Sequence, residues 1–180
     1  MLFRPFVINA VTGDHIPVSI EPATHMDLAI THRNPKWQTD WDSNYLSDPS
    51  IERFSVKTLE GELIGLGAYQ IRGKKAYVFI VYMESAPHSN PTMTQHSERK
   101  YYGIGVLLIA YGIKYSIDHG CRGDIVFDAK TEELAKHYET DFHALRIPSE
   151  DSGGPKRYML ADKEAWTIFS RFLEEDSQNE

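Results

Sequence analysis

The chain has 180 residues, 41% of them hydrophobic and 25% charged, which is the composition of an ordinary soluble globular protein with a substantial core. Its 19 basic and 26 acidic residues give a net charge of −7 without a basic run, which excludes the phosphate-neutralising surface that nucleic-acid binding requires. The single cysteine excludes an intrachain disulfide, and the longest apolar run, Ile104 to Tyr111, is far shorter than the roughly 20 residues of a membrane span. Because Met1 to Pro5 lacks the apolar stretch of a signal peptide, we expect a cytoplasmic protein that binds neither membrane nor nucleic acid.

The first half of the chain is predicted to be rich in strands. Alternating apolar residues predict an antiparallel meander with strands near Phe3 to Ala10, Arg53 to Leu59, Leu63 to Ile71 and Ala76 to Ser85. Between the first two strands, Glu21 to Ser47 predicts helical pieces broken at Pro35, a segment that could line an acceptor site. Trp37, Trp41 and Tyr45 would form one aromatic face in a helix; ordinary packing is the favoured interpretation and an acceptor pocket the alternative.

The second half alternates helices and strands. After a polar loop from Pro87 to Lys100, apolar residues at helical spacing predict a helix that ends at Gly120. The remaining expected elements are a strand at 124–129, a helix from the N-cap Thr131 through Tyr138, strands near 144–147 and 157–161, a terminal helix at about 163–173 and a frayed tail at about 174–180. We therefore expect one domain over residues 1–180, of the α/β (α+β) class, with a mixed, mainly antiparallel sheet and helices on both faces.

Two glycines at the start of the predicted helix, Gly103 and Gly105, carry the main functional signal. The N-terminus of a helix offers unpaired N–H groups and the positive end of the helix dipole, which together suit a diphosphate. Without Cβ atoms, the glycines let the backbone bend and let phosphate oxygens approach closely. The residues expected to bind the diphosphate through their backbone form one run, Lys100, Tyr101, Tyr102, Gly103, Ile104, Gly105 and Val106.

Three other interpretations compete for this turn. A purely structural turn is equally compatible with the local pattern. A dinucleotide-binding motif is disfavoured because no strand is predicted immediately before the glycines and a third glycine is missing. A P-loop is disfavoured because no Gly-Lys-Ser or Gly-Lys-Thr follows.

At this motif the sequence resembles the GCN5-related N-acetyltransferase superfamily. Lys100-x-x-Gly103-x-Gly105 fits the signature Gln/Arg-x-x-Gly-x-Gly/Ala at the start of the helix after the fourth strand, with Lys100 in place of Gln or Arg. The resemblance covers about Tyr82 to Ala144 and implies that acetyl-CoA is the cosubstrate. It also implies that an amine attacks the acetyl group directly in a ternary complex. Lys130-Thr131 is a second departure, because many members carry there an Asn that supports the cofactor; Thr131 is kept as a candidate cofactor-binding residue.

The resemblance also implies where the reaction takes place. In the resembled fold, a free backbone N–H on the fourth strand receives the thioester carbonyl, which corresponds here to the stretch from Met83 to Ser85. Glu84, at the end of that strand, is the first candidate for the general base that deprotonates the acceptor ammonium. A solvent-facing or salt-bridged glutamate is the structural alternative, and His88 and His96 on the following loop are rival bases.

Tyr138 is the candidate general acid. It lies one helix after the glycine turn, at the position where the superfamily commonly has a tyrosine that protonates the coenzyme A sulfur. A reference phenol pKa of ~10 keeps such a group protonated at neutral pH. Simple core packing is the alternative role for this aromatic side chain.

No metal site is expected. His137, Asp141 and His143 have loose metal-like spacing, but no second cluster completes a site. Cys121 lacks a flanking base and is interpreted as a structural residue.

The sequence thus predicts an N-acetyltransferase that uses acetyl-CoA, with a non-catalytic acyl-CoA-binding or interaction module as the alternative. The acceptor stays open among small amines, polyamines, aminoglycosides and peptide or protein amines, as does the use of longer acyl-CoAs. The oligomeric state is also open, with a homodimer among the options.

Overall fold

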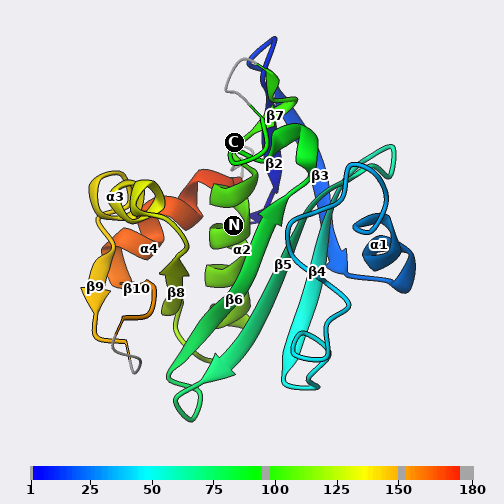
Figure 1. Ribbon diagram of the computed structural model, residues 1–180. Coiled ribbons are helices and arrows are strands. Elements are labelled where there is room, and N and C mark those ends of the chain that lie inside the picture. The colour runs from blue at the N-terminus through cyan, green and yellow to red at the C-terminus, as the bar shows by residue number, and fades with distance from the viewer. Residues whose placement is uncertain (1, 95–97, 150–152, 175–180) are drawn as a thin grey trace. The chain divides into compact units, whose positions relative to one another are not determined.

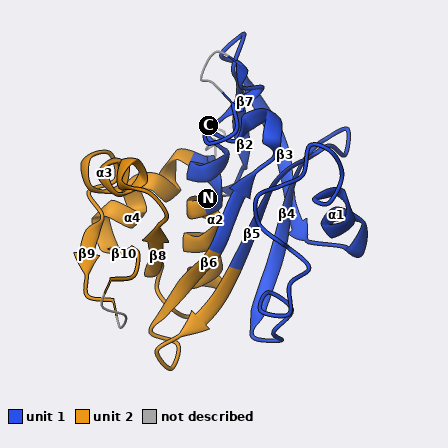
Figure 2. Ribbon diagram, in the orientation of Figure 1, with its two compact units in different colours: residues 1–68, 82–108, 172–180 blue, residues 69–81, 109–171 orange. Residues whose placement is uncertain are grey.

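The computed structural model describes residues 2–94, 98–149 and 153–174. Within these ranges the chain forms four α-helices and a mostly antiparallel set of strands (Figure 1), which confirms the predicted mixed α/β class. The chain divides into two compact units (Figure 2): unit 1 comprises residues 1–68, 82–108 and 172–180, and unit 2 comprises 69–81 and 109–171. Two strands, one α-helix and the 3₁₀ helix Ser170–Phe172 contribute residues to both units, and the single-domain organisation of the chain stays a prediction.

Unit 1 contains the N-terminal strands and the glycine turn. Its strands are β2 (Phe6–Asn9), β3 (His15–Pro22), β4 (Ile51–Thr58), β7 (Tyr101–Tyr102), most of β5 (Leu63–Arg72) and the end of β6 (Tyr77–Ser85). The hydrogen-bonded order is β7-β2-β3-β4-β5-β6, and β2, β3, β4 and β7 pair antiparallel. Separately, β1 (Leu2–Phe3) pairs antiparallel with β11 (Leu173–Glu174). The short helix α1 (His25–Ile30) begins with a capping box between Thr24 and Asp27.

Unit 2 contains the C-terminal strands and most of the helical residues. The first half of β6 pairs in parallel with β8 (Ile125–Ala129), and β10 (Lys156–Leu160) pairs antiparallel with both β8 and β9 (Leu145–Ile147). Its helices are the larger part of α2 (Ile104–Asp118), α3 (Glu132–Thr140) and α4 (Asp162–Phe169). Gly112 in α2 is explained by packing, because a Cβ there would stand 3.1 Å from both Ile80 Cδ1 and Tyr69 Cε1. The missing side chain lets the helix lie directly on these residues.

The sequence reading missed the strand β3. Pro17 and Pro22 argue against a strand because proline has no N–H to donate to a ladder, and most side chains of β3 are not fully buried. The chain nevertheless pairs on both sides: Pro17 lies opposite Phe6 in β2, and Val18 lies opposite Thr58 in β4. Ladder bonds from the non-proline residues were therefore sufficient to hold this segment extended.

The predicted helical segment from Glu21 to Ser47 was largely wrong. Only α1 is helical there, and residues 31–50 form turns and irregular backbone. Trp37 and Trp41 are 4% and 0% exposed, whereas Tyr45 is 56% exposed, so the three residues do not share one aromatic face. The favoured interpretation, packing, is confirmed for the two tryptophans.

Two smaller corrections concern the loop before α2 and the C-terminal residues. The short strand β7 stands between the polar loop and α2, where the sequence predicted a direct passage from loop to helix. Glu174, predicted to start a frayed tail, lies in β11 opposite Leu2, and residues 175–180 lie outside the described residues. Among the described residues, no helix has the length and apolar character needed to cross a membrane.

Candidate active site

The glycine turn joins a short strand to a long helix within unit 1. Tyr101 and Tyr102 pair with Asn9 and Ile8 of β2, and the chain then passes through Gly103, whose φ of 87° lies in the left-handed region. Helix α2 begins at the next residue, and the N–H of Leu107 donates to the Gly103 carbonyl at 3.0 Å. Gly103 therefore provides the sharp turn that carries the chain from the strand into the helix.

Four successive N–H groups at this helix start lack acceptors. Across residues 2–94, 98–149 and 153–174, no hydrogen bond uses the N–H groups of Gly103, Ile104, Gly105 and Val106. A Cβ built on Gly103 or on Gly105 would meet nothing within 4 Å, and the first turn of the helix carries no acidic side chain. These N–H groups and the positive end of the helix dipole can therefore receive an anionic group that approaches the backbone closely.

The structure narrows the predicted run of binding residues. The N–H of Lys100 donates to the His88 carbonyl at 2.9 Å, and the N–H of Tyr101 donates to Ser89 Oγ at 3.0 Å. Both amides are already used within the protein, so the candidate anion site begins at Gly103. Lys100 Nζ is also occupied, because it lies 2.8 and 3.0 Å from the two carboxylate oxygens of Glu62.

A chain of polar contacts supports the turn from the neighbouring loop. Glu62 Oε1 lies 3.0 Å from His88 Nε2, and His88 Nδ1 lies 2.6 Å from Ser89 Oγ. Burial lowers the pKa of His88, an effect that the negative charge of Glu62 opposes and the positive charge of Lys100 reinforces. A neutral ring fits these contacts: Nε2–H donates to Glu62, and Nδ1 accepts from the Ser89 hydroxyl, whose oxygen accepts from the Tyr101 N–H.

Three residues of this neighbourhood were not singled out from the sequence: Glu62, Ser89 and Arg99. Arg99 Nε is buried and has no partner among the described residues, and its guanidinium carbon lies 6.0 Å from the ring centre of Tyr102. The only available signal for Ser89 was its place beside His88. The sequence did not indicate a role for Glu62, because the residues that it contacts, His88 and Lys100, lie far along the chain.

Glu84, the first candidate base, is buried and fully engaged. Its side chain is in unit 1, and the residue is 6% exposed. Oε2 accepts from the Gln38 N–H at 2.6 Å, while Oε1 accepts from the Thr39 N–H at 2.9 Å and from Trp41 Nε1 at 3.2 Å. A base role would have to use the second acceptor site of Oε2, which among the described residues accepts only from the Gln38 N–H.

The regular alternation of β6 is interrupted at some point between Val78 and Ala86. The Val78 N–H donates to Asp124 on the β8 side, whereas the Ala86 N–H donates to Ile64 of β5. In a regular strand, N–H groups eight positions apart point to the same side, so one extra residue must intervene between Val78 and Ala86. The register with β8 covers only Val78 to Ile80, although β6 continues to Ser85. The predicted carbonyl-binding role of Met83 and Ser85 stays a prediction.

Unit 2 holds the two remaining candidates. Thr131 is the N-cap of α3, and its hydroxyl oxygen accepts from the Leu134 N–H at 3.2 Å. Tyr138 is 3% exposed and packs edge-on against Phe127 at 4.8 Å, so it contributes to the core as the alternative interpretation foresaw. Its hydroxyl nevertheless has no hydrogen-bond partner among the described residues, and burial raises the pKa of Tyr138 to about 12. The phenol is thus protonated and has a proton free to donate.

The rival histidine His96 lies outside the described residues. Of the residues with loose metal-like spacing, His137 Nδ1 contacts the carboxylate of Asp141. Within the described part of the chain, no group of three or more potential metal ligands comes together. Cys121 is buried, and burial raises the pKa of its thiol, as suits a structural residue.

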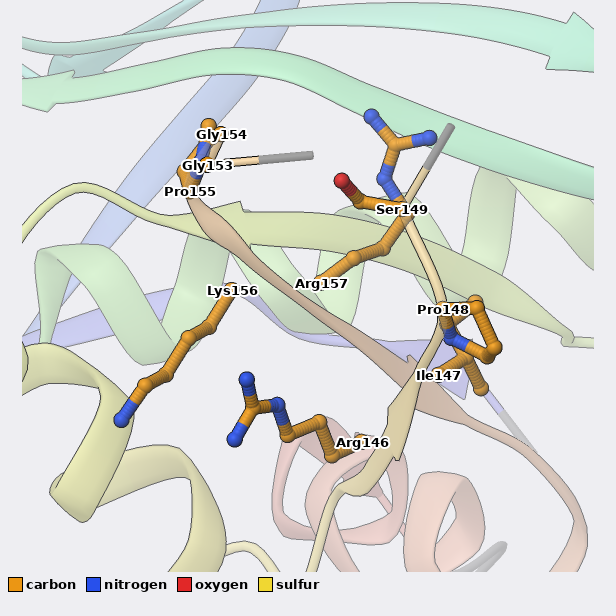
Figure 3. A pocket seen from close by; sticks show the side chains of 9 residues that line it. All are labelled: Arg146, Ile147, Pro148, Ser149, Gly153, Gly154, Pro155, Lys156 and Arg157. Carbon is orange, nitrogen blue, oxygen red and sulfur yellow. The ribbon is translucent and has the colours of Figure 1, made fainter. Parts of the chain in front are cut away.

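A cavity of about 470 Å³ lies in unit 2 along the β9–β10 hairpin (Figure 3). Three of its lining residues, Arg146, Lys156 and Arg157, are cationic. Lys156 Nζ lies 2.8 Å from Glu132, and Arg157 binds Asp128 through two hydrogen bonds of 2.7 and 3.0 Å. Because two of the three positive charges are already compensated, we assign no ligand to this cavity.

The fold described above is that of the GCN5-related N-acetyltransferases. No protein-family model and no curated protein sequence matches the chain. Spermidine N-acetyltransferase SpeG from Vibrio cholerae, in complex with CoA and spermine, has a TM-score of 0.55 at 17% identity, over 82% of this chain and 97% of that chain. A dodecameric structure of the same enzyme has a TM-score of 0.56 at 16% identity, over 86% of this chain and 97% of that chain.

A second kind of acetyltransferase is equally similar. AAC(6')-Ib, in complex with paromomycin and acetyl-CoA, has a TM-score of 0.57 at 17% identity, over 83% of this chain and 96% of that chain. At these identities the comparisons establish the fold. A polyamine-acetylating enzyme and an aminoglycoside-binding one therefore share the architecture of this chain.

Proposed function

We propose that the protein is an acyl-CoA-dependent N-acetyltransferase that transfers the acetyl group of acetyl-CoA to an amine. The observation that carries the proposal is the start of α2, where the N–H groups of Gly103, Ile104, Gly105 and Val106 lack acceptors among the described residues. Open space at both glycines leaves room for a diphosphate. The structurally similar enzymes support the choice of ligand, since one binds CoA and another acetyl-CoA.

The proposed reaction is a direct transfer. The acceptor nitrogen attacks the thioester carbon and gives up a proton to a base, the C–S bond breaks, and the departing thiolate takes a proton from Tyr138. The role is supported by a hydroxyl that has no hydrogen-bond partner among the described residues and that is protonated at neutral pH. The stretch from Met83 to Ser85 is proposed to receive the thioester carbonyl, with Thr131 supporting the cofactor.

The group that takes the proton of the acceptor amine has less structural support than the general acid. The carboxylate of Glu84 accepts three hydrogen bonds, and both ring nitrogens of His88 have partners. Glu84 as the base remains a prediction from the sequence. The engaged state of both groups also favours the alternative function, a module that binds acyl-CoA without turning it over.

The acceptor class proposed for this chain is a cationic small-molecule amine, by analogy with the polyamine and aminoglycoside ligands of the similar structures. The net charge of −7 suits such acceptors. A peptide amine is the second option.

The experiment that tests the function measures thiol release from acetyl-CoA with the full chain. The panel contains spermidine, an aminoglycoside, a lysine peptide and a blank without acceptor. Amine-dependent thiol release supports the transferase. Tight CoA binding without release on any amine supports the module, and absence of CoA binding contradicts both.

A further inference from the structure

The buried carboxylate of Glu84 organises a segment that has no regular structure of its own. Residues 37–41 lie in a stretch without helix or strand, so their N–H groups have no ladder to join. Glu84 accepts from two of these N–H groups, those of Gln38 and Thr39, and from the indole of Trp41. The carboxylate thus replaces the hydrogen bonds that secondary structure would supply.

The burial of Glu84 is consistent with this role. A carboxylate that is 6% exposed is costly unless its oxygens are satisfied, and here both oxygens accept hydrogen bonds. The donors are two backbone amides and the fully buried indole of Trp41, and all three are held in place by the folded chain. The three donors compensate the burial of the carboxylate, and the carboxylate in turn holds the segment in place.

The same network reaches the loop that supports the glycine turn. Gln38 Oε1 accepts from Thr92 Oγ1 at 2.9 Å and from Asn90 Nδ2 at 3.3 Å. The neighbouring Ser89 accepts from the N–H of Tyr101 at the entrance to the turn. Within unit 1, residues 37–41, the end of β6 and the loop after it are therefore linked by hydrogen bonds.

We propose that Glu84 is a positioning residue that fixes residues 37–41 as part of the acceptor-binding wall, and that the acceptor's proton passes to solvent water instead of to this carboxylate. The acceptor part of this inference rests on the proposed function. The positioning part does not, because it concerns the order of residues 37–41 in the protein without ligands.

The first test measures amide hydrogen exchange at Gln38 and Thr39 in the wild type and in Glu84→Gln. The glutamine keeps the shape of the side chain but presents an N–H₂ group to one of the donors. Exchange at both amides should become at least about tenfold faster, while the core amides of β5 keep their protection. Unchanged exchange at Gln38 and Thr39 would overturn the positioning role, whether or not the protein is an enzyme.

The second test separates positioning from base catalysis by kinetics. For Glu84→Gln we expect the acceptor KM to rise about tenfold, with kcat within about threefold of wild type and the same pH dependence of kcat. Loss of a base would instead lower kcat by about 10²–10⁴-fold at saturating acceptor, with recovery as pH rises. That second pattern would overturn the proposal.

Trp41→Phe provides a milder version of the same change, in case Glu84→Gln does not fold. It removes the indole donor and leaves both backbone donors and the carboxylate in place. We expect a smaller rise of the acceptor KM and faster exchange at Thr39, because the segment loses one of its three hydrogen bonds to the carboxylate. A fall in kcat without change in KM or exchange would contradict the proposal here too.

Discussion

Ile104 Cγ2 lies 2.8 Å from the place where a Cβ on Gly65 would stand. Gly65 belongs to the buried part of β5, and Ile104 is the first residue of α2. The missing side chain lets the helix begin directly on the strand. Gly65, which needs no contact with a ligand, thus sets the position of the helix start, where four N–H groups have no acceptor among the described residues.

Gly65→Ala should destabilise the fold and weaken CoA binding together. The added Cβ meets a branch of the stiff, 2% exposed Ile104 side chain, and overpacking of this kind costs about 1–3 kcal/mol. Chemical denaturation and calorimetric CoA titration measure the two effects. In an Ile104→Ala background the cost of Gly65→Ala should shrink, because the clashing methyl is gone; a cost that is equal in both backgrounds would contradict the relationship.

Gly105→Val should weaken CoA binding by at least about tenfold, because its side chain would occupy the space assigned to the diphosphate. The protein itself should tolerate the change sterically, since a Cβ there meets nothing within 4 Å. Gly105→Ala sharpens the test: alanine should stabilise the helix by up to about 1 kcal/mol, yet still weaken CoA binding. Normal CoA affinity in Gly105→Val would remove the proposed site.

Tyr138→Phe should lower kcat by about 10²-fold and leave CoA affinity unchanged, since only the proton donor is lost. Because burial raises the pKa of Tyr138 to about 12, its ionisation should not limit turnover below about pH 10. Tyr158→Phe is the matched control in unit 2, as its hydroxyl already donates to Glu139 at 2.5 Å. Steady-state kinetics of both variants decide the assignment, and equal kcat values for them would remove Tyr138 as the acid.

Stability should fall on acidification in part through His88. Burial lowers its pKa in the folded protein, so the unfolded chain binds the proton more readily. The stabilisation by the neutral ring is therefore complete above the unfolded pKa of about 6.5 and is lost as pH falls through the lower folded value. Denaturation at several pH values should show a smaller acid-side loss for His88→Gln than for wild type. Parallel curves for the two proteins would contradict this.

The sequence predicted the features that depend on local pattern. The strands near β4, β5 and β6 follow from alternating or continuous apolar residues, and the turn at Gly103 and Gly105 from backbone requirements alone. It could not predict the partners of Glu84, because Gln38 lies 46 positions away and only the folded chain brings the two together. For the same reason it assigned the amides of Lys100 and Tyr101 to a ligand, although His88 and Ser89 accept from them.

The start of α2 is the proposed binding site for the diphosphate of coenzyme A. Titration of CoA into ¹⁵N-labelled protein, followed by amide NMR, tests it residue by residue. We expect the largest shifts at the N–H groups of Gly103, Ile104, Gly105 and Val106, saturating together with a single affinity. Saturation with CoA that leaves these four amides unshifted would contradict the account.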